Sequence, residues 1–138
     1  MTTPLYVLVL YALWTIAVLF AGVATARARR VMKGEKFSDF PGGVAEGPSY
    51  HQRAMRAHLN CVENLPVYAA VAITAAIAGV TGPVISALAI TVLVFRIAQS
   101  SLHLSFEQTE KVVRIRGSLF GIQILAIIWM ALIVLIYA

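Results

Sequence analysis

Charged residues divide this chain into long uncharged stretches. Residues 1–26, 64–95 and 117–138 contain no charged side chain. At a rise of about 1.5 Å per residue, a helix over residues 5–26 covers a hydrocarbon core of roughly 30 Å. The middle stretch is too long for one crossing, and Gly79-Val80-Thr81-Gly82-Pro83 near its centre favours a tight reversal. The pattern therefore predicts four membrane-spanning helices.

The boundaries of these helices follow from where helix-breaking residues occur. Residues 49–63 are polar but contain no glycine or proline, so the second helix begins well before Asn64. Pro83 suits the first turn of the third helix. We expect helices over residues 5–28, 49–79, 83–105 and 113–137, with a crossover loop over residues 31–49. The predicted fold class is all-α, an integral membrane four-helix bundle in which residues 1–138 form a single domain.

The first uncharged stretch has an alternative interpretation as a cleavable signal peptide. Residues 24–26, Ala-Thr-Ala, are similar to the small-residue site at which such peptides are cut. However, no basic residue precedes the stretch, and its apolar run is longer than the roughly 7 to 15 residues typical of a signal peptide. We therefore expect the first helix to be retained.

Composition and charge also indicate a membrane protein. The chain is 60% hydrophobic and 12% charged, which excludes an ordinary soluble domain. Its eleven Lys and Arg residues lie in or near the connections at residues 27–53 and 104–116, whereas the chain ends and the turn at Thr81 carry none. The positive-inside rule makes these two loops cytoplasmic and both termini extracytoplasmic, as in a multi-pass cell-membrane protein. No nucleic-acid recognition module accompanies the basic residues, so nucleic acid is not an expected partner.

Polar side chains form stripes on three of the predicted helices. At 100° per residue, those on the second helix share a face of roughly 80° and those on the third a face of roughly 100°. The stripes are Arg53, Arg56, Asn60 and Glu63; Arg96, Gln99, Ser100 and His103; and Arg116, Phe120 and Gln123. One interpretation is structural: Glu63 neutralises Arg96 or Arg56, and the amides bridge helices. The alternative is that the excess of arginine over carboxylate binds an anionic small molecule.

Two other kinds of chemistry are not favoured by the pattern. His51, His58 and His103 lack the spacing of a metal site, so we expect no bound metal. Cys61 is the only cysteine, which excludes an intrachain disulfide. It lies more than roughly 90° from the polar stripe of its helix, so we expect it to pack in the core.

Residues 56–66, Arg-Ala-His-Leu-Asn-Cys-Val-Glu-Asn-Leu-Pro, resemble the second-helix signature of the MAPEG superfamily, the membrane-associated proteins of eicosanoid and glutathione metabolism. The opening Arg-Ala-His-Leu-Asn is most similar to the microsomal glutathione transferase branch. Four spans, an arginine-rich end to the first helix, Arg96-Ile97-Ala98 in the third and an arginine shortly before the last span extend the resemblance to the whole chain.

The resemblance implies a homotrimer that holds glutathione, as co-substrate, between neighbouring protomers. Arg116 then matches the catalytic arginine that stabilises the glutathione thiolate, with Arg114 as the alternative if the register differs. The cofactor-binding positions implied in this way are Arg53, Arg56, Asn60, Glu63, Arg96, His103, Phe120 and Arg27, with Arg29 as the alternative to Arg27. The implied activity is a glutathione transferase or peroxidase of detoxification, acting on hydrophobic small molecules or lipid hydroperoxides that arrive from the membrane lipids.

Some positions depart from this family pattern. His103, Gln99 and Phe120 stand where several eicosanoid-making relatives carry Tyr, His and Tyr, which weakens any prediction of prostaglandin or leukotriene synthesis. A different thiol or an anionic lipid in place of glutathione stays open. The alternative functions are a non-catalytic member that binds a lipid or a partner, and a channel or transporter. The latter lacks a continuous polar path along the third helix.

Overall fold

The computed structural model describes residues 1–40 and 42–137 of the chain. Pro41, in the predicted crossover loop, and Ala138, at the end of the last uncharged stretch, lie outside the described residues. The described part is entirely helical apart from its connections. Its elements are α1 (Thr3–Val18), the π-helical segment η1 (Leu19–Ala24), α2 (Thr25–Met32), the 3-10 turn η2 (Phe37–Asp39), α3 (Ser49–Ile77), α4 (Pro83–Ser105) and α5 (Glu110–Tyr137).

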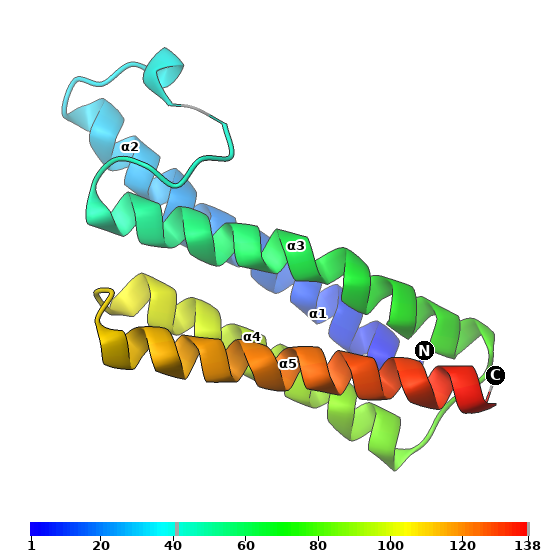
Figure 1. The fold of residues 1–138 in the computed structure, drawn as a ribbon. Helices are drawn as coiled ribbons and strands as arrows, with labels where there is room; N and C mark the ends of the chain where they lie inside the picture. The colour runs from blue at the N-terminus through cyan, green and yellow to red at the C-terminus, as the bar shows by residue number, and fades with distance from the viewer. Residues whose placement is uncertain (41, 138) are drawn as a thin grey trace.

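In these described residues, four helices are long and apolar enough to cross a membrane, which confirms the predicted fold class. They are Thr3–Met32, Ser49–Ile77, Pro83–Ser105 and Glu110–Tyr137, of which the first is the continuous run of α1, η1 and α2. Both termini and the α3–α4 connection lie at one end of the bundle, and the other two connections lie at the opposite end (Figure 1).

Four helix boundaries differ from the predicted ones, each for a local reason. The first helix begins at Thr3 instead of residue 5, with Pro4 in its first turn. The first helix continues to Met32 instead of residue 28, because no glycine or proline occurs between residue 28 and Gly34. The second helix ends at Ile77 instead of 79, and Gly79 takes the left-handed conformation, with φ of 70°, that ends many helices. The last helix begins at Glu110 instead of 113, where the Thr109 hydroxyl accepts a hydrogen bond from the Val112 amide at 3.3 Å.

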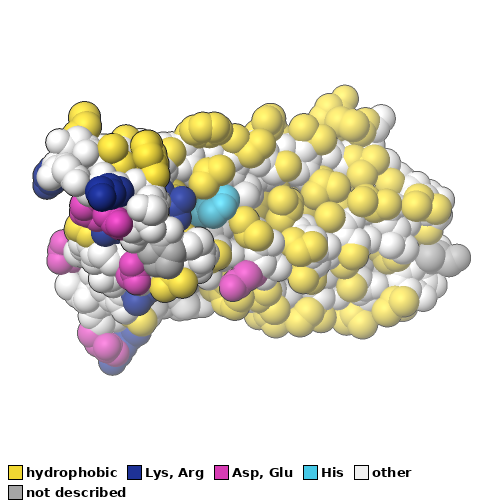
Figure 2. Space-filling model, turned by 90° about the horizontal axis from the view of Figure 1, so that it is seen from above, with side chains coloured by type: hydrophobic (Ala, Val, Ile, Leu, Met, Phe, Trp, Pro, Cys, Tyr) yellow, Lys and Arg dark blue, Asp and Glu magenta, His cyan; other side chains and the backbone are white. Residues whose placement is uncertain are grey.

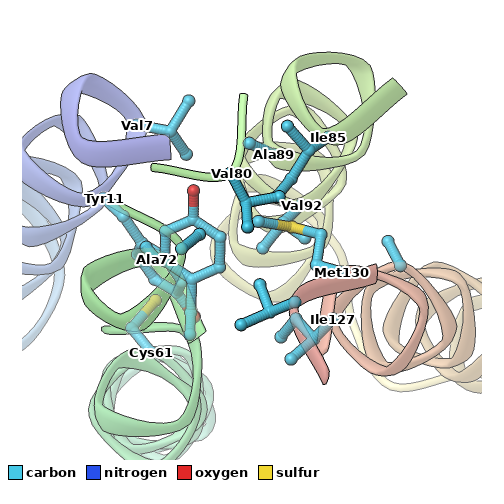
Figure 3. Packing of buried hydrophobic residues seen from close by; sticks show 14 of the residues in the cluster. Val7, Tyr11, Cys61, Ala72, Val80, Ile85, Ala89, Val92, Ile127 and Met130 are labelled. Atoms are coloured by element: carbon cyan, nitrogen blue, oxygen red, sulfur yellow. The ribbon is translucent and has the colours of Figure 1, made fainter. Parts of the chain in front are cut away.

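The interior of the bundle is built largely from small apolar residues. Ala57, Ala72 and Ala89 are fully buried, and they let neighbouring helices approach closely. Val7 and Tyr11 from α1 face residues of α3, α4 and α5 in the centre of this core (Figure 3). Cys61 belongs to the same core with no exposed surface, as predicted. Close packing of this kind is the main source of helix association inside a membrane.

The surface of the bundle is divided between an apolar body and a charged end. Large apolar side chains such as Leu13, Leu125 and Leu135 are more than half exposed along the helices. Charged side chains gather at one end of the face seen in Figure 2, while the rest of that face is mostly hydrophobic. An exposed apolar belt next to a charged end is the surface that a lipid bilayer and its interface would cover.

Candidate functional site

A pocket of about 480 Å³ opens among α3, α4 and α5 toward the charged end of the bundle. It contains seven of the residues singled out in the sequence. Its lining consists of Arg56, Leu59, Asn60, Glu63, Gln99, His103, Val113, Arg116, Gly117 and Phe120. The structure therefore brings polar groups from three helices to one cavity, in which Glu63 is the one acidic residue and Arg56 and Arg116 are the two arginines.

Helical spacing explains why these residues share one cavity. Residues 56, 59, 60 and 63 of α3 follow the three- and four-residue intervals that place side chains on one face of a helix. Residues 113, 116, 117 and 120 of α5 follow the same intervals, and Gly117 leaves open space beside its backbone. The polar stripes predicted on these helices thus face one another across the pocket.

His103 connects the two sides of the pocket. Its Nδ1 lies 3.1 Å from Nη1 of Arg116, and its Nε2 lies 3.3 Å from the side-chain amide of Asn60. An arginine guanidinium can only donate hydrogen bonds, so Nδ1 of His103 accepts and the imidazole is neutral with its proton on Nε2. This N–H faces Asn60, whose amide accepts it only with its oxygen, not its Nδ2, turned toward the ring. His103 therefore holds Arg116 by a hydrogen bond, and Asn60 of α3 lies beside its other ring nitrogen.

Arg116 retains unused donor capacity in this arrangement. Only 9% of the residue is exposed, and its Nε has no hydrogen-bond partner in the described part of the chain. No carboxylate pairs with it among residues 1–40 and 42–137, so its charge is compensated by no neighbouring acid. A buried guanidinium with a free donor is costly unless an anion or an acceptor meets it. The pocket is therefore suited chemically to a negatively charged guest.

Arg56 and Glu63 lie at the outer side of the pocket and are exposed in the single chain. Arg56 donates a hydrogen bond from Nη1 to Oε1 of Gln108, in the connection between α4 and α5, at 2.5 Å. Glu63 forms no ion pair in the described residues. The pocket thus offers one positive and one negative group at its opening, in addition to Arg116 at its inner side.

Comparison with known proteins places the chain in a family. The model of the MAPEG family matches residues 4–136, which is nearly the whole chain. The chain belongs to the MAPEG family. Searches of the curated proteins and of the solved structures found no significant match. Membership assigns this MAPEG protein to a general role in membrane glutathione or eicosanoid metabolism, without distinguishing one branch of the family.

Three residues that the resemblance assigned to glutathione do not line the pocket of this MAPEG protein. Arg53 donates to Glu107 at 3.1 Å and to the Ser49 hydroxyl. Arg27 lines a separate groove beside η1 and α2. Arg96 points into the bundle and is only 1% exposed. Arg96 does not reach the pocket because it lies about 10 Å along α4 from His103, deeper in the bundle.

The structural interpretation of the polar stripes is correct in part. Nε2 of Gln123 on α5 donates to Oε1 of Gln99 on α4 at 3.1 Å in the buried interior, so amides do bridge helices. The expected neutralisation of Arg96 or Arg56 by Glu63 is wrong for the described residues, whose ion pairs involve Arg30, Arg53 and Arg114 instead. Arginine therefore remains in excess at the pocket.

The sequence pattern did not predict Gln108, Leu59, Val113 or Gly117 as part of the site. Gln108 lies in a short connection, where helical periodicity gives no information. The other three lie on the pocket faces of α3 and α5 at helical spacing from the predicted residues. That spacing was the signal that could have identified them, although an apolar residue at such a position is more often part of a core.

Proposed function

We propose that this MAPEG protein is a membrane glutathione transferase or peroxidase whose site is the pocket among α3, α4 and α5. The observation that carries the proposal is the buried Arg116, held by His103 and left with a free donor on a pocket wall. Glutathione carries two carboxylates, one amino group and a thiol. Arg56 is suited to a carboxylate and Glu63 to the amino group, since both lie at the opening.

Arg116 has the chemistry to promote ionisation of the thiol. A guanidinium beside the sulfur favours the thiolate, which is the reactive form. In the transferase reaction the thiolate attacks an electrophilic carbon of a hydrophobic substrate. A carbon–sulfur bond forms, and the leaving group departs with its electron pair. The acceleration comes from thiolate formation and from holding both reactants in one pocket.

Arg96 contributes positive charge next to the pocket without lining it. Its guanidinium is buried near the Tyr11 ring, 5.7 Å from the ring centroid, and Nε and Nη2 have no partner in the described residues. In a low-dielectric interior this charge raises the positive potential around His103 and Gln99. We assign Arg96 an electrostatic role toward the bound anion without direct contact.

The proposal includes assembly as a homotrimer in which neighbouring protomers flank the site. Arg56 and Glu63, exposed in the single chain, would then be covered by an adjacent copy. A hydrophobic electrophile or lipid hydroperoxide would enter sideways from the membrane lipids, toward the apolar lining formed by Leu59, Val113 and Phe120. Phe120 adds apolar surface beside the sulfur and carries no hydroxyl group to donate to it.

Titration of the purified protein with glutathione tests the proposal through ultraviolet difference absorbance of the thiolate. We expect a saturable thiolate signal in the unaltered protein and its loss in Arg116→Ala. The matched control is Arg114→Ala, which removes the same charge two residues away on α5. Arg114 is exposed and pairs with Glu110, so its removal should leave the signal in place.

Three results would contradict this mechanism. A thiolate signal that survives in Arg116→Ala would exclude Arg116 as the activating group. A signal lost in Arg114→Ala but kept in Arg116→Ala would move the catalytic role to the neighbouring arginine. No signal in any of the proteins, together with no glutathione binding by calorimetry, would favour a non-catalytic member of the family that binds a lipid in the same pocket.

A further inference from the structure

A second concave surface lies at the charged end of the bundle and shares no residue with the pocket described above. It is a groove of about 620 Å³ between the end of the first membrane-crossing helix and the turn η2. Its walls are apolar, and Arg27 is the one charged residue on them. The apolar wall residues include Leu19, Phe20, Val23, Phe37 and Phe40.

Large apolar side chains on the walls of this groove are exposed. Phe20 is 65% exposed and Phe37 is 78% exposed. Phe20 lies seven residues before Arg27 in a continuous helix, which is about 10 Å along the helix axis. The side chain of Arg27, the first charged residue of the chain, thus lies about two helical turns from the exposed ring of Phe20. The polar interface on one side of a bilayer is roughly 5–8 Å deep, so Arg27 lies in or beyond it when Phe20 lies at the edge of the hydrocarbon core.

Arg27 is the group in the groove that lacks an electrostatic partner. No carboxylate pairs with it in the described residues, and its Nε is buried without a hydrogen bond. Its guanidinium lies 5.8 Å from the centroid of the Phe40 ring, and Nη2 makes a 3.9 Å contact to the sulfur of Met55. Neither contact neutralises the charge. A ligand for this groove therefore needs an anionic group next to an apolar part.

Arg30, one turn further along, differs from Arg27 because its charge is compensated. Its Nε donates to both carboxylate oxygens of Glu35, at 3.0 and 2.9 Å. This hydrogen bonding lowers the pKa of the Glu35 carboxyl, so Glu35 stays ionised at neutral pH. Arg30 also lies over the Phe40 ring, 4.7 Å from its centroid, and so fixes one wall of the groove. The uncompensated charge at the groove is that of Arg27.

We propose that this groove binds a phospholipid with an anionic headgroup. The phosphate meets Arg27, and an acyl chain lies along Leu19, Phe20 and Val23. A soluble anion would gain nothing from the apolar walls, and an uncharged hydrophobic molecule would leave Arg27 without a partner. This inference does not depend on glutathione chemistry in the other pocket.

Quenching of a single tryptophan in the groove by brominated lipids tests the proposal. The reporter is the full chain with Phe20→Trp, Trp14→Phe and Trp129→Phe, since Trp14 and Trp129 line other surfaces. It is reconstituted in phosphatidylcholine bilayers that contain a fixed fraction of phosphatidylglycerol. Bromine is carried either by the phosphatidylglycerol or by an equal amount of the phosphatidylcholine, so the surface charge is constant. We expect phosphatidylglycerol to be preferred at residue 20 by about fivefold, as for one basic residue at an anionic surface.

Two substitutions in the reporter separate the groove from general surface charge. Arg27→Gln should remove the preference, and Arg27→Lys should keep most of it. Arg29→Gln is the matched control, because Arg29 is exposed and lies over the Tyr50 ring outside the groove. Circular dichroism of each variant verifies that the helices are intact.

Each other outcome overturns the proposal. Equal quenching by the two brominated lipids in the reporter itself would mean that no anionic lipid is selected, whatever the variants do. Equal loss of preference in Arg27→Gln and Arg29→Gln would mean that only surface charge acts. Protection of the tryptophan from both lipids would mean that protein, either the loop or a second copy of the chain, fills the groove.

Discussion

His103 is the residue on which the geometry of the pocket depends most. It accepts a hydrogen bond from Arg116 and faces Asn60, so one imidazole fixes the guanidinium relative to α3. We expect His103→Phe, which has no acceptor, to let Arg116 move. In the glutathione titration the thiolate signal should then appear only at higher pH. The loss should be tenfold or more at neutral pH, since a hydrogen bond to a charged group contributes about 1.5–3 kcal/mol.

The matched variant is His103→Gln, whose amide oxygen can still accept from Arg116. It should retain most of the thiolate signal, and kcat should fall less than in His103→Phe while KM for glutathione changes little in either. If both variants lose the signal to the same extent, the hydrogen bond to Arg116 is not the reason. A structural role alone predicts instead that thermal stability falls with no shift in the pH at which the thiolate appears.

Single arginines show where sequence reasoning reaches its limit. The sequence places Arg53, Arg56 and Arg96 on polar faces, and the structure agrees about Arg56 at the pocket. The partners of the other two depend on neighbours that no pattern reveals. Arg53 pairs with Glu107 in a loop, and Arg96 points into the core. Helical periodicity defines the direction of a side chain, but not its depth or the group across from it.

At the scale of elements, the four helices could be predicted almost completely from the sequence. Uncharged length defines a crossing, and the glycine and proline residues around Thr81 define a turn. The predicted polar face of α4 is also confirmed, because Arg96, Gln99, Ser100 and His103 are all buried. The π-helical segment η1 was not predicted, since its sequence, Leu19–Ala24, is as apolar as the helix around it.

Close approach between elements is set by Gly22 in η1. A Cβ atom there would lie 3.0 Å from Cδ2 of Leu104 and 3.2 Å from Cβ of Ala54, so α3 and α4 leave little room. We expect Gly22→Val to destabilise the bundle by about 1–3 kcal/mol through overpacking. Thermal unfolding in detergent, followed by circular dichroism, measures the effect as a lower midpoint.

Gly121 on α5 provides the control for this prediction. A Cβ atom at Gly121 meets nothing within 4 Å, so Gly121→Val adds the same atoms without a clash. Its midpoint should stay within error of the unaltered protein or rise, because glycine inside a helix is itself unfavourable. Equal midpoints for the two valine variants would show that η1 has room to move away from α3 and α4.

At the scale of the whole molecule, the two ends of the bundle differ in charge. Most of the basic residues lie at its charged end, in a connection or in the helix ends beside it, and the other end holds both termini and the turn at Thr81 (Figures 1 and 2). Four crossings require the termini to lie on one side of the membrane, which the fold supports. The fold alone does not define which side of the membrane this is. The orientation depends on the energetics of insertion, and the distribution of Lys and Arg indicates it.

The positive-inside rule predicts that the charged end faces the cytoplasm, and single cysteines in a Cys61→Ala background can test this. Ser38 and Thr81 are exposed at opposite ends of the bundle. An impermeant maleimide should label Thr81→Cys on intact cells and Ser38→Cys only after lysis, because retaining Lys and Arg in the cytoplasm directs insertion. The parent chain should label in neither case, since Cys61 has no exposed surface. Labelling of Ser38→Cys on intact cells would show the opposite orientation, with the pocket opening outside the cell and away from cytoplasmic glutathione.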